Sequence, residues 1–267
     1  MGGRLVIAGV ISLIAIIGYF ANSSLNPVTG RKQHIALTQD QEIALGLNTA
    51  PEMIQQFGGL STDDRATSLV QTVGAKVLAA IPREAPTYPF RYHLLADRKT
   101  VNAFALPGGQ VFITEALLSQ LETEGQLAAV LGHETGHVLG RHSAQQIAKS
   151  ELMQGLAGAA TIATSDDRGN SGGTLAQMAA QFALLKYGRD DELEADKLGL
   201  DILHAAGYDP RAMIGLMKVL DKASGGGNAG RGPDFTSTHP SPGNRIERLN
   251  ALIAEKFPKG VPDGLKP

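Results

Sequence analysis

The sequence predicts an α+β fold that is predominantly helical, with a small β-sheet beside one central helix. Apolar residues between Ala66 and Ile81 recur at spacings of three and four, which is the pattern of a helix with one buried face. Residues 88–96 and 101–114 have strand character, and Pro107-Gly108-Gly109 interrupts the second stretch as a hairpin turn would. With 267 residues, 43% of them hydrophobic, the chain is long enough to bury a full core.

The composition excludes several kinds of site. The chain has no cysteine, so it forms no disulfide, binds no metal through thiolates and uses no thiol nucleophile. A formal net charge of −2 gives no basic surplus, which argues against nucleic acid as the main partner. Any metal site must therefore be built from histidine and carboxylate side chains.

The N-terminal segment predicts an association with a membrane. Leu5 to Ala21 contains no charged residue, and its length is near the lower limit for a helix that spans a bilayer. We expect residues 1–25 to form an uncleaved anchor; cleavage as a signal peptide at Ala21-Asn22-Ser23 is the alternative. Arg4 lies closer to the apolar run than Arg31 does, which favours export of the rest of the chain to the periplasmic side.

Residues 26–257 are expected to form one domain, which begins with a polar tether and is followed by a loose tail over residues 258–267. Thr38 and Gln41 have the spacing of a capping box and open the first helix of this domain. Asn102 to Leu106 is short and ends at a proline, as strands at a sheet edge often do. Further helices are expected at 115–121, 124–151, 175–206, 210–223 and 242–257, with glycine-rich loops at 165–174 and 225–233.

The expected helix at 124–151 carries the signature of zinc hydrolases, His133-Glu134-Thr135-Gly136-His137. On a helix, His133 and His137 lie about 40° apart on one face, so both imidazoles can reach one zinc ion. Glu134 lies about 100° aside, which suits a carboxylate that accepts a proton from water without binding the metal. Because such a pentapeptide also arises by chance on an amphipathic helix, the interpretation requires a third ligand.

The best candidate for the third zinc ligand is Glu192, since catalytic zinc sites take three ligands from the protein. Glu192 and Asp196 share a helical face, so Glu192 can bind zinc while Asp196 accepts a hydrogen bond from a ligand imidazole. Glu194 points about 200° away from Glu192 on such a helix. His142 is nearer in sequence, but on a continuing helix it lies on the face opposite the motif. A solvated acidic stretch is the alternative interpretation of residues 190–196.

Four separated motifs make the chain resemble the gluzincin metallopeptidases of family M48. They are the zinc signature with Glu192-x-x-x-Asp196, the segment Asn102 to Gly109, the segment Asn26 to Arg31, and Thr238-His239-Pro240-Ser241-Pro242 with Arg245. The resemblance implies a zincin-like metalloprotease domain with one Zn²⁺ and endopeptidase activity on membrane or envelope proteins, often in quality control. Some members have several membrane spans whereas this chain has one candidate, so their membrane-embedded chambers do not carry over.

These residues predict hydrolysis of a peptide bond by metal-activated water, with Glu134 passing a proton to the leaving amine. An extended substrate would add as a strand along Asn102, Ala103, Phe104 and Ala105, because that edge precedes the zinc helix. Two alternative interpretations remain: a zinc-binding but weakly active chaperone-like or scaffold protein at the membrane, and a membrane-tethered interaction module.

His239 has two alternative roles. It is a catalytic candidate, because a zinc hydrolase needs a donor besides the metal to stabilise the oxyanion of the reacting carbonyl. Its neutral imidazole can instead occupy the open zinc position and block it until substrate arrives. The sequence leaves both roles open, along with the role of Arg245.

Overall fold

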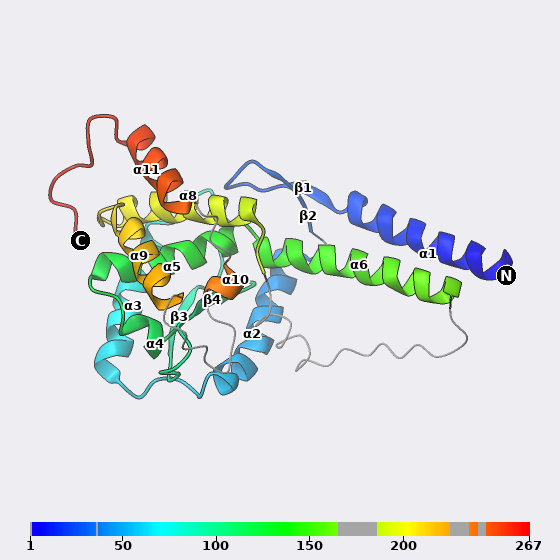
Figure 1. Ribbon diagram of the computed structural model, residues 1–267, viewed down its shortest axis with the longest axis horizontal. Helices are drawn as coiled ribbons and strands as arrows, with labels where there is room; N and C mark the ends of the chain where they lie inside the picture. The colour runs from blue at the N-terminus through cyan, green and yellow to red at the C-terminus, as the bar shows by residue number, and fades with distance from the viewer. Residues whose placement is uncertain (1, 36, 165–185, 225–234, 240–243) are drawn as a thin grey trace.

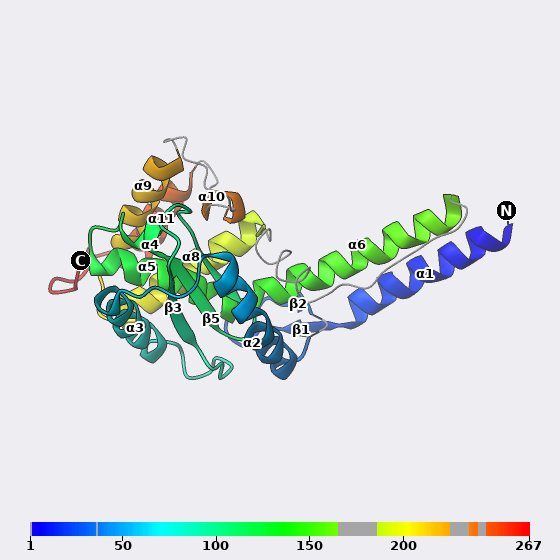
Figure 2. The same ribbon diagram turned by 90° about the horizontal axis from the view of Figure 1, so that it is seen from below.

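The computed structural model describes residues 2–35, 37–164, 186–224, 235–239 and 244–267. Figures 1 and 2 show a body in which helices surround a small sheet, and a stalk of two helices that projects from this body. The helices are α1 (Gly2–Ala21), α2 (Gln39–Gln56), α3 (Asp64–Ala79), α4 (Glu115–Leu118), α5 (Glu124–Leu139), α6 (His142–Thr164), α8 (Arg189–Ala205), α9 (Ala212–Ser224), α10 (Phe235–Thr238) and α11 (Arg245–Lys256). The strands are β1 (Ser23–Leu25), β2 (Lys32–His34), β3 (Arg91–Leu95), β4 (Ala103–Leu106) and β5 (Gln110–Thr114). The α+β prediction is confirmed.

The main sheet has the order β3-β5-β4. β4 and β5 pair antiparallel across the turn at Pro107-Gly108-Gly109, so the predicted hairpin is confirmed, and β3 pairs parallel with β5. Phe104 faces Phe112 in the register of the hairpin, and their rings stack with centroids 4.9 Å apart. β4 therefore lies at an edge of this sheet, as its short length and the following proline predicted.

The first two helices of the body follow the predicted patterns. The capping box of Thr38 and Gln41 opens α2, which continues through Pro51 without a break. The apolar stripe of α3 is buried at Val70, Val73 and Val77. The expected apolar faces are buried only in part, because Leu47 of α2 is 49% exposed and Leu69 and Leu78 of α3 are 41% and 42% exposed.

The centre of the body is α5, in which every residue from Gly125 to Leu139 is buried. This helix packs against α8, α9, α3 and β4. Its contact with α8 is unusually close, because a β-carbon added to Gly136 would lie 2.8 Å from the carbonyl oxygen of Ala195. On α8, a β-carbon added to Gly199 would lie 3.0 Å from the backbone nitrogen of His133. The glycines let the two helix backbones approach, which positions the side chains of both helices for one site.

The expected single helix over 124–151 is wrong, because the chain turns between α5 and α6. Arg141 has a positive φ of 54°, which the interior of a right-handed helix does not accommodate. Two contacts hold this residue: its Nε donates to Glu42 at 3.0 Å, and its Nη2 donates to the carbonyl of Leu37 at 2.8 Å. α6 consequently leaves the body in a new direction and runs beside α1.

The expected tether also proves to be ordered. β1 and β2 form an antiparallel hairpin that packs at the C-terminal end of α5. Asn26 donates to the carbonyl of Leu139 at 2.8 Å, and Gln33 donates to the carbonyl of Gly140 at 2.6 Å. These side chains satisfy carbonyls that the end of a helix leaves without partners.

The C-terminal part differs from expectation in two places. α8 begins at Arg189, after Gly188 in an extended conformation, and the rest of the helix expected from 175 lies largely outside the described residues. The last ten residues, expected to be a loose tail, are held at their end, where Pro267 accepts from the backbone nitrogen of Gly125 at 2.9 Å. The glycine-rich loops expected at 165–174 and 225–233 lie outside the described residues.

Gly136→Ala tests the close packing of α5 on α8. We expect the free energy of unfolding to fall by about 1–3 kcal/mol through overpacking, although alanine favours a helix over glycine by about 1 kcal/mol. Gly158→Ala in α6 is the matched control, because nothing lies within 4 Å of its added β-carbon. Urea unfolding followed by circular dichroism measures both variants. Equal stability of the two variants would show that the α5–α8 contact tolerates a β-carbon.

Candidate metal centre

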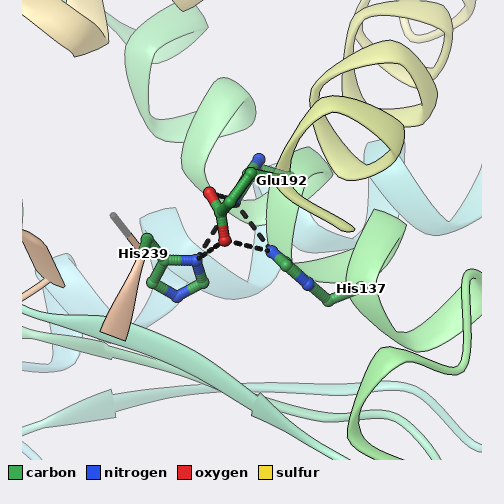
Figure 3. Close-up of side chains that lie close together, drawn as sticks. His137, Glu192 and His239 are labelled. Carbon is green, nitrogen blue, oxygen red and sulfur yellow. Dashed lines mark hydrogen bonds and ion pairs between the residues drawn. The ribbon is translucent and has the colours of Figure 1, made fainter. Parts of the chain in front are cut away.

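Four buried side chains from three segments converge at the centre of the body. His133 and His137 come from α5, Glu192 comes from α8, and His239 follows α10. One ligand atom from each of them lies within 4.8 Å of the others. Figure 3 shows Glu192 between the rings of His137 and His239, with its carboxylate directed at both.

The distances between these atoms match the coordination shell of one zinc ion. Nε2 of His133 is 3.1 Å from Nε2 of His137 and 3.4 Å from Nδ1 of His239. Oε1 of Glu192 is 3.4 Å from Nε2 of His137 and 2.9 Å from Nδ1 of His239. Ligand atoms placed tetrahedrally around zinc, at its usual bond length of about 2.1 Å, are about 3.4 Å apart.

The buried charges also fit a divalent cation. Glu134, Glu192 and Asp196 are at most 1% exposed, and Arg245, 2% exposed, lies among them. With neutral imidazoles, these three carboxylates and one guanidinium leave two negative charges uncompensated, which is costly in a dry interior. Zn²⁺ neutralises two charges and takes nitrogen and oxygen ligands of this kind.

Asp196 and Arg245 contact the ligands from outside the cluster. Oδ1 of Asp196 is 3.1 Å from Nδ1 of His133, the ring nitrogen that faces away from the cluster. Arg245 donates to both oxygens of Asp196 at 2.7 and 2.6 Å, and its Nη1 lies 3.1 Å from Glu192. Burial alone would raise the pKa of Asp196, but Arg245 holds it below its usual range. An ionised Asp196 can accept a hydrogen bond from Nδ1–H of His133, which keeps the proton on Nδ1 and directs the Nε2 lone pair at the metal position.

His142 and Glu194 form a second chain of contacts, which the sequence analysis missed. Because the chain turns after α5, the ring of His142 folds back until its Nδ1 is 2.9 Å from Nδ1 of His137. Nε2 of His142 is 2.8 Å from Oε2 of Glu194, and this carboxylate pairs with Arg31 at 3.3 Å. The expectation that His142 lies on the opposite face is therefore wrong, since it assumed a continuous helix. Gly140, directly after the motif helix, is the sequence signal for the break.

Aromatic rings also restrain two of the histidines. The ring of Tyr187 stacks on His137 with centroids 3.9 Å apart, and its hydroxyl is 3.0 Å from Oγ of Ser143. The ring of Phe235 stacks on His239 with centroids 4.3 Å apart. No local pattern in the sequence predicts the role of these aromatic residues, because they stack on histidines from distant segments.

Glu134 is fully buried beside the cluster. Neither of its carboxylate oxygens makes a hydrogen bond within the described residues, and Nε2 of His239 lies 3.5 Å from Oε1. Burial raises the pKa of Glu134 above its usual range. A carboxylate with a raised pKa and open acceptor positions has the properties of a general base.

The sheet edge that was expected to bind substrate lies beside the metal helix. β4 packs against α5, and in the described part of the chain it pairs with β5 only. The carbonyl of Asn102 accepts from the backbone nitrogen of Thr114 at 3.0 Å. Hydrogen-bonded and non-hydrogen-bonded pairs alternate along an antiparallel ladder. Because Asn102 forms a hydrogen-bonded pair with Thr114, Ala103 and Ala105 direct their backbone N–H and C=O groups away from β5.

Known proteins resemble the chain over most of its length. A family model described as Peptidase family M48 matches residues 64–253. Mitochondrial metalloendopeptidase OMA1 of Schizosaccharomyces pombe is 31% identical over 242 residues, which are 89% of this chain and 68% of that protein. The beta-barrel assembly-enhancing proteases of Yersinia pestis and Escherichia coli (strain K12) are 28% and 29% identical, and the aligned residues are 86% and 82% of this chain. The aligned regions are only 47% and 45% of those two proteins.

The family match contains the residues that build the candidate centre. His133, Glu134, His137, Glu192 and His239 all lie within residues 64–253, which are well over half of the chain. The geometry of the cluster and the metalloendopeptidase relatives agree on one chemistry. The chain is therefore a metalloendopeptidase, and it belongs to peptidase family M48.

Proposed function

We propose that this protein is a membrane-anchored zinc endopeptidase that cleaves membrane or envelope proteins in quality control. The observation that carries the enzymatic part is Glu134, a buried carboxylate without a hydrogen bond among the described residues, beside four converging ligand atoms. A zinc-binding chaperone or scaffold, the alternative function, has no need of a buried acceptor at this position. The substrate class is supported by relatives named for β-barrel assembly and for mitochondria.

In this proposal, His133, His137 and Glu192 hold the zinc ion. Bound zinc supplies polarisation of the scissile carbonyl and lowers the pKa of water towards about 7. Glu134 accepts the proton of the attacking water and donates it to the leaving amine. Asp196 and His142 keep the ligand imidazoles in the orientation that the metal requires.

We further propose that α1 is retained as the membrane anchor, with the body on the exported, periplasmic side. Among the described residues, α1 is the one helix long and apolar enough to cross a bilayer. Its packing along α6 favours retention over cleavage at Ala21-Asn22-Ser23, since removal of α1 would expose the facing side of α6. The positive charge of Arg4 at the far end supports this orientation.

Metal analysis and casein hydrolysis test the catalytic assignment. We expect the purified full chain to hold one zinc ion and to lose activity with a chelator. Glu134→Gln should keep the zinc and lose activity by about 100- to 10,000-fold, the usual contribution of a general base. Glu192→Ala should lose the zinc, whereas Glu194→Ala should keep it with an affinity about 10- to 100-fold lower, as for a residue that orients a ligand.

Two results would contradict these assignments. A Glu134→Gln variant with most of its activity would exclude Glu134 as the base. Equal zinc affinity of the Glu192→Ala and Glu194→Ala variants, measured by competition with a chromophoric chelator, would exclude Glu192 as the third ligand. Glu192→Asp is the conservative control, because it keeps the carboxylate and shortens its reach by one methylene.

Proline substitution tests whether substrate adds to β4. Ala105→Pro removes a backbone N–H that points away from β5, so it should raise KM about 2- to 10-fold, the worth of one hydrogen bond. Zinc content should not change. Ala105→Ser is the matched control because it keeps the N–H, and Ala103→Pro repeats the test at the other outward position. Unchanged KM in both proline variants would place the substrate in another groove.

His239→Ala distinguishes the two roles of this histidine. Because Nδ1 of His239 stands as a fourth ligand atom, we propose that it closes the open zinc position until substrate arrives. The variant should therefore keep its zinc and show equal or higher kcat on casein. A loss of about 100- to 1,000-fold in kcat with zinc retained would instead assign His239 to stabilisation of the oxyanion.

A further inference from the structure

The stalk is an antiparallel pair of helices, not a single anchor helix. Figures 1 and 2 both show α1 and α6 side by side outside the body, with the N-terminus near the far end of α6. A β-carbon added to Gly155 would lie 3.0 Å from Cβ of Ala15, so the helices approach closely at this point. Small residues at such a contact are typical of helix pairs in membranes.

The contact at Gly155 fixes the register of the pair. Because the helices run antiparallel, each step along α6 away from the body corresponds to one step along α1 towards its N-terminus. Leu152 then lies level with Gly18, and both residues line one groove between the helices. By the same count, Thr164 lies level with Val6.

The last charged residues of α6 lie level with the end of the apolar run of α1 that is nearest the body. Lys149 and Glu151 are exposed, and they are the last charged residues of this helix. Beyond them Met153, which is 59% exposed, Gln154 and Gly158 are exposed; Gln154 is the one polar side chain of residues 152–160, and none of these residues is charged. A helix face directed at water normally carries charged and polar residues, so water does not explain this composition.

We propose that residues 152–164 of α6 lie among the acyl chains of the bilayer beside α1, so that the membrane anchor is a hairpin of two helices. This inference rests on the proposed anchoring by α1. Nine large apolar side chains of α1 are exposed, and acyl chains are the surroundings in which such side chains are stable. The uncharged part of α6 extends this apolar surface of α1 at the same depth in the bilayer. Its thirteen residues are about 20 Å long, which is less than the bilayer core of about 30 Å, so α6 enters the bilayer without crossing it.

The hairpin would fix the height of the metal centre above the membrane. α6 begins at His142, whose ring contacts the ligand His137, and its charged residues end nine positions later at Glu151. Nine residues of helix are about 14 Å long. The centre is thus held close to the bilayer surface, where it would cleave polypeptides near the point at which they leave the membrane.

Site-specific fluorescence in vesicles tests the hairpin with the full, zinc-loaded chain. Because the chain has no cysteine, single variants can be labelled with a bimane probe without further changes. The probes are Met153→Cys and Gly158→Cys on α6, Leu13→Cys on α1 as the lipid control, and Arg65→Cys on α3 as the exposed water control. The vesicles contain phosphatidylcholine and phosphatidylglycerol, with a doxyl quencher on the acyl chains. Zinc content equal to that of the unmodified chain shows that each labelled protein is folded.

We expect both α6 probes to be quenched as strongly as the Leu13 probe, and the Arg65 probe not to be quenched. The Gly158 probe should respond more strongly than the Met153 probe to a quencher placed deep in the acyl chain. Quenching at Leu13 without quenching at Met153 or Gly158 would overturn the hairpin and leave the anchor intact. No quenching at any of the three would overturn the anchor as well. If the α6 probes are unquenched and the same cysteines, left unlabelled, resist a water-soluble maleimide, a second copy of the chain covers this face, which also excludes lipid.

Discussion

The close approach of α5 and α8 is the constraint on which the metal centre depends. Glu192 lies far from His133 and His137 in sequence, and its carboxylate reaches both imidazoles only because the two backbones approach at Gly136 and Gly199. A β-carbon on Gly136 would overlap backbone of α8, and one on Gly199 would lie only 3.0 Å from backbone of α5. Packing in the core thus sets the distances within the cluster, and these distances define which metal and which ligand geometry the site accepts.

Each histidine that α5 contributes to the candidate metal centre is held by a different set of side chains. Asp196 contacts His133 from α8, with Arg245 of α11 holding its carboxylate. His142 contacts His137 from the start of α6 and is itself bound by Glu194. The second support belongs to the helix that runs out beside α1, and Arg31 of the N-terminal hairpin reaches the same Glu194. The N-terminal hairpin and the start of α6 therefore both contact side chains that support the candidate metal centre.

Much of the fold could be predicted from local patterns, and the predictions that were wrong have a common cause. The capping box at Thr38, the stripe of α3 and the hairpin at Pro107-Gly108-Gly109 depend on neighbouring residues, and each was predicted. The single helix over 124–151 was wrong, because the turn at Arg141 is held by Glu42 and Leu37, about 100 residues earlier in the chain. The hairpin in the expected tether was not predicted for the same reason, since Asn26 and Gln33 bind carbonyls at the end of α5.

The sequence by itself determined the kinds of ligand and their helical faces. The spacing of His133 and His137, and that of Glu192 and Asp196, fix a common face because helical periodicity is a local property of the chain. Only the tertiary structure decided which faces meet. It brought Nδ1 of His239 to the fourth corner of the cluster and the ring of His142 behind His137. These contacts join segments that are distant in sequence, and their geometry depends on core packing and on one left-handed residue, which no local spacing encodes.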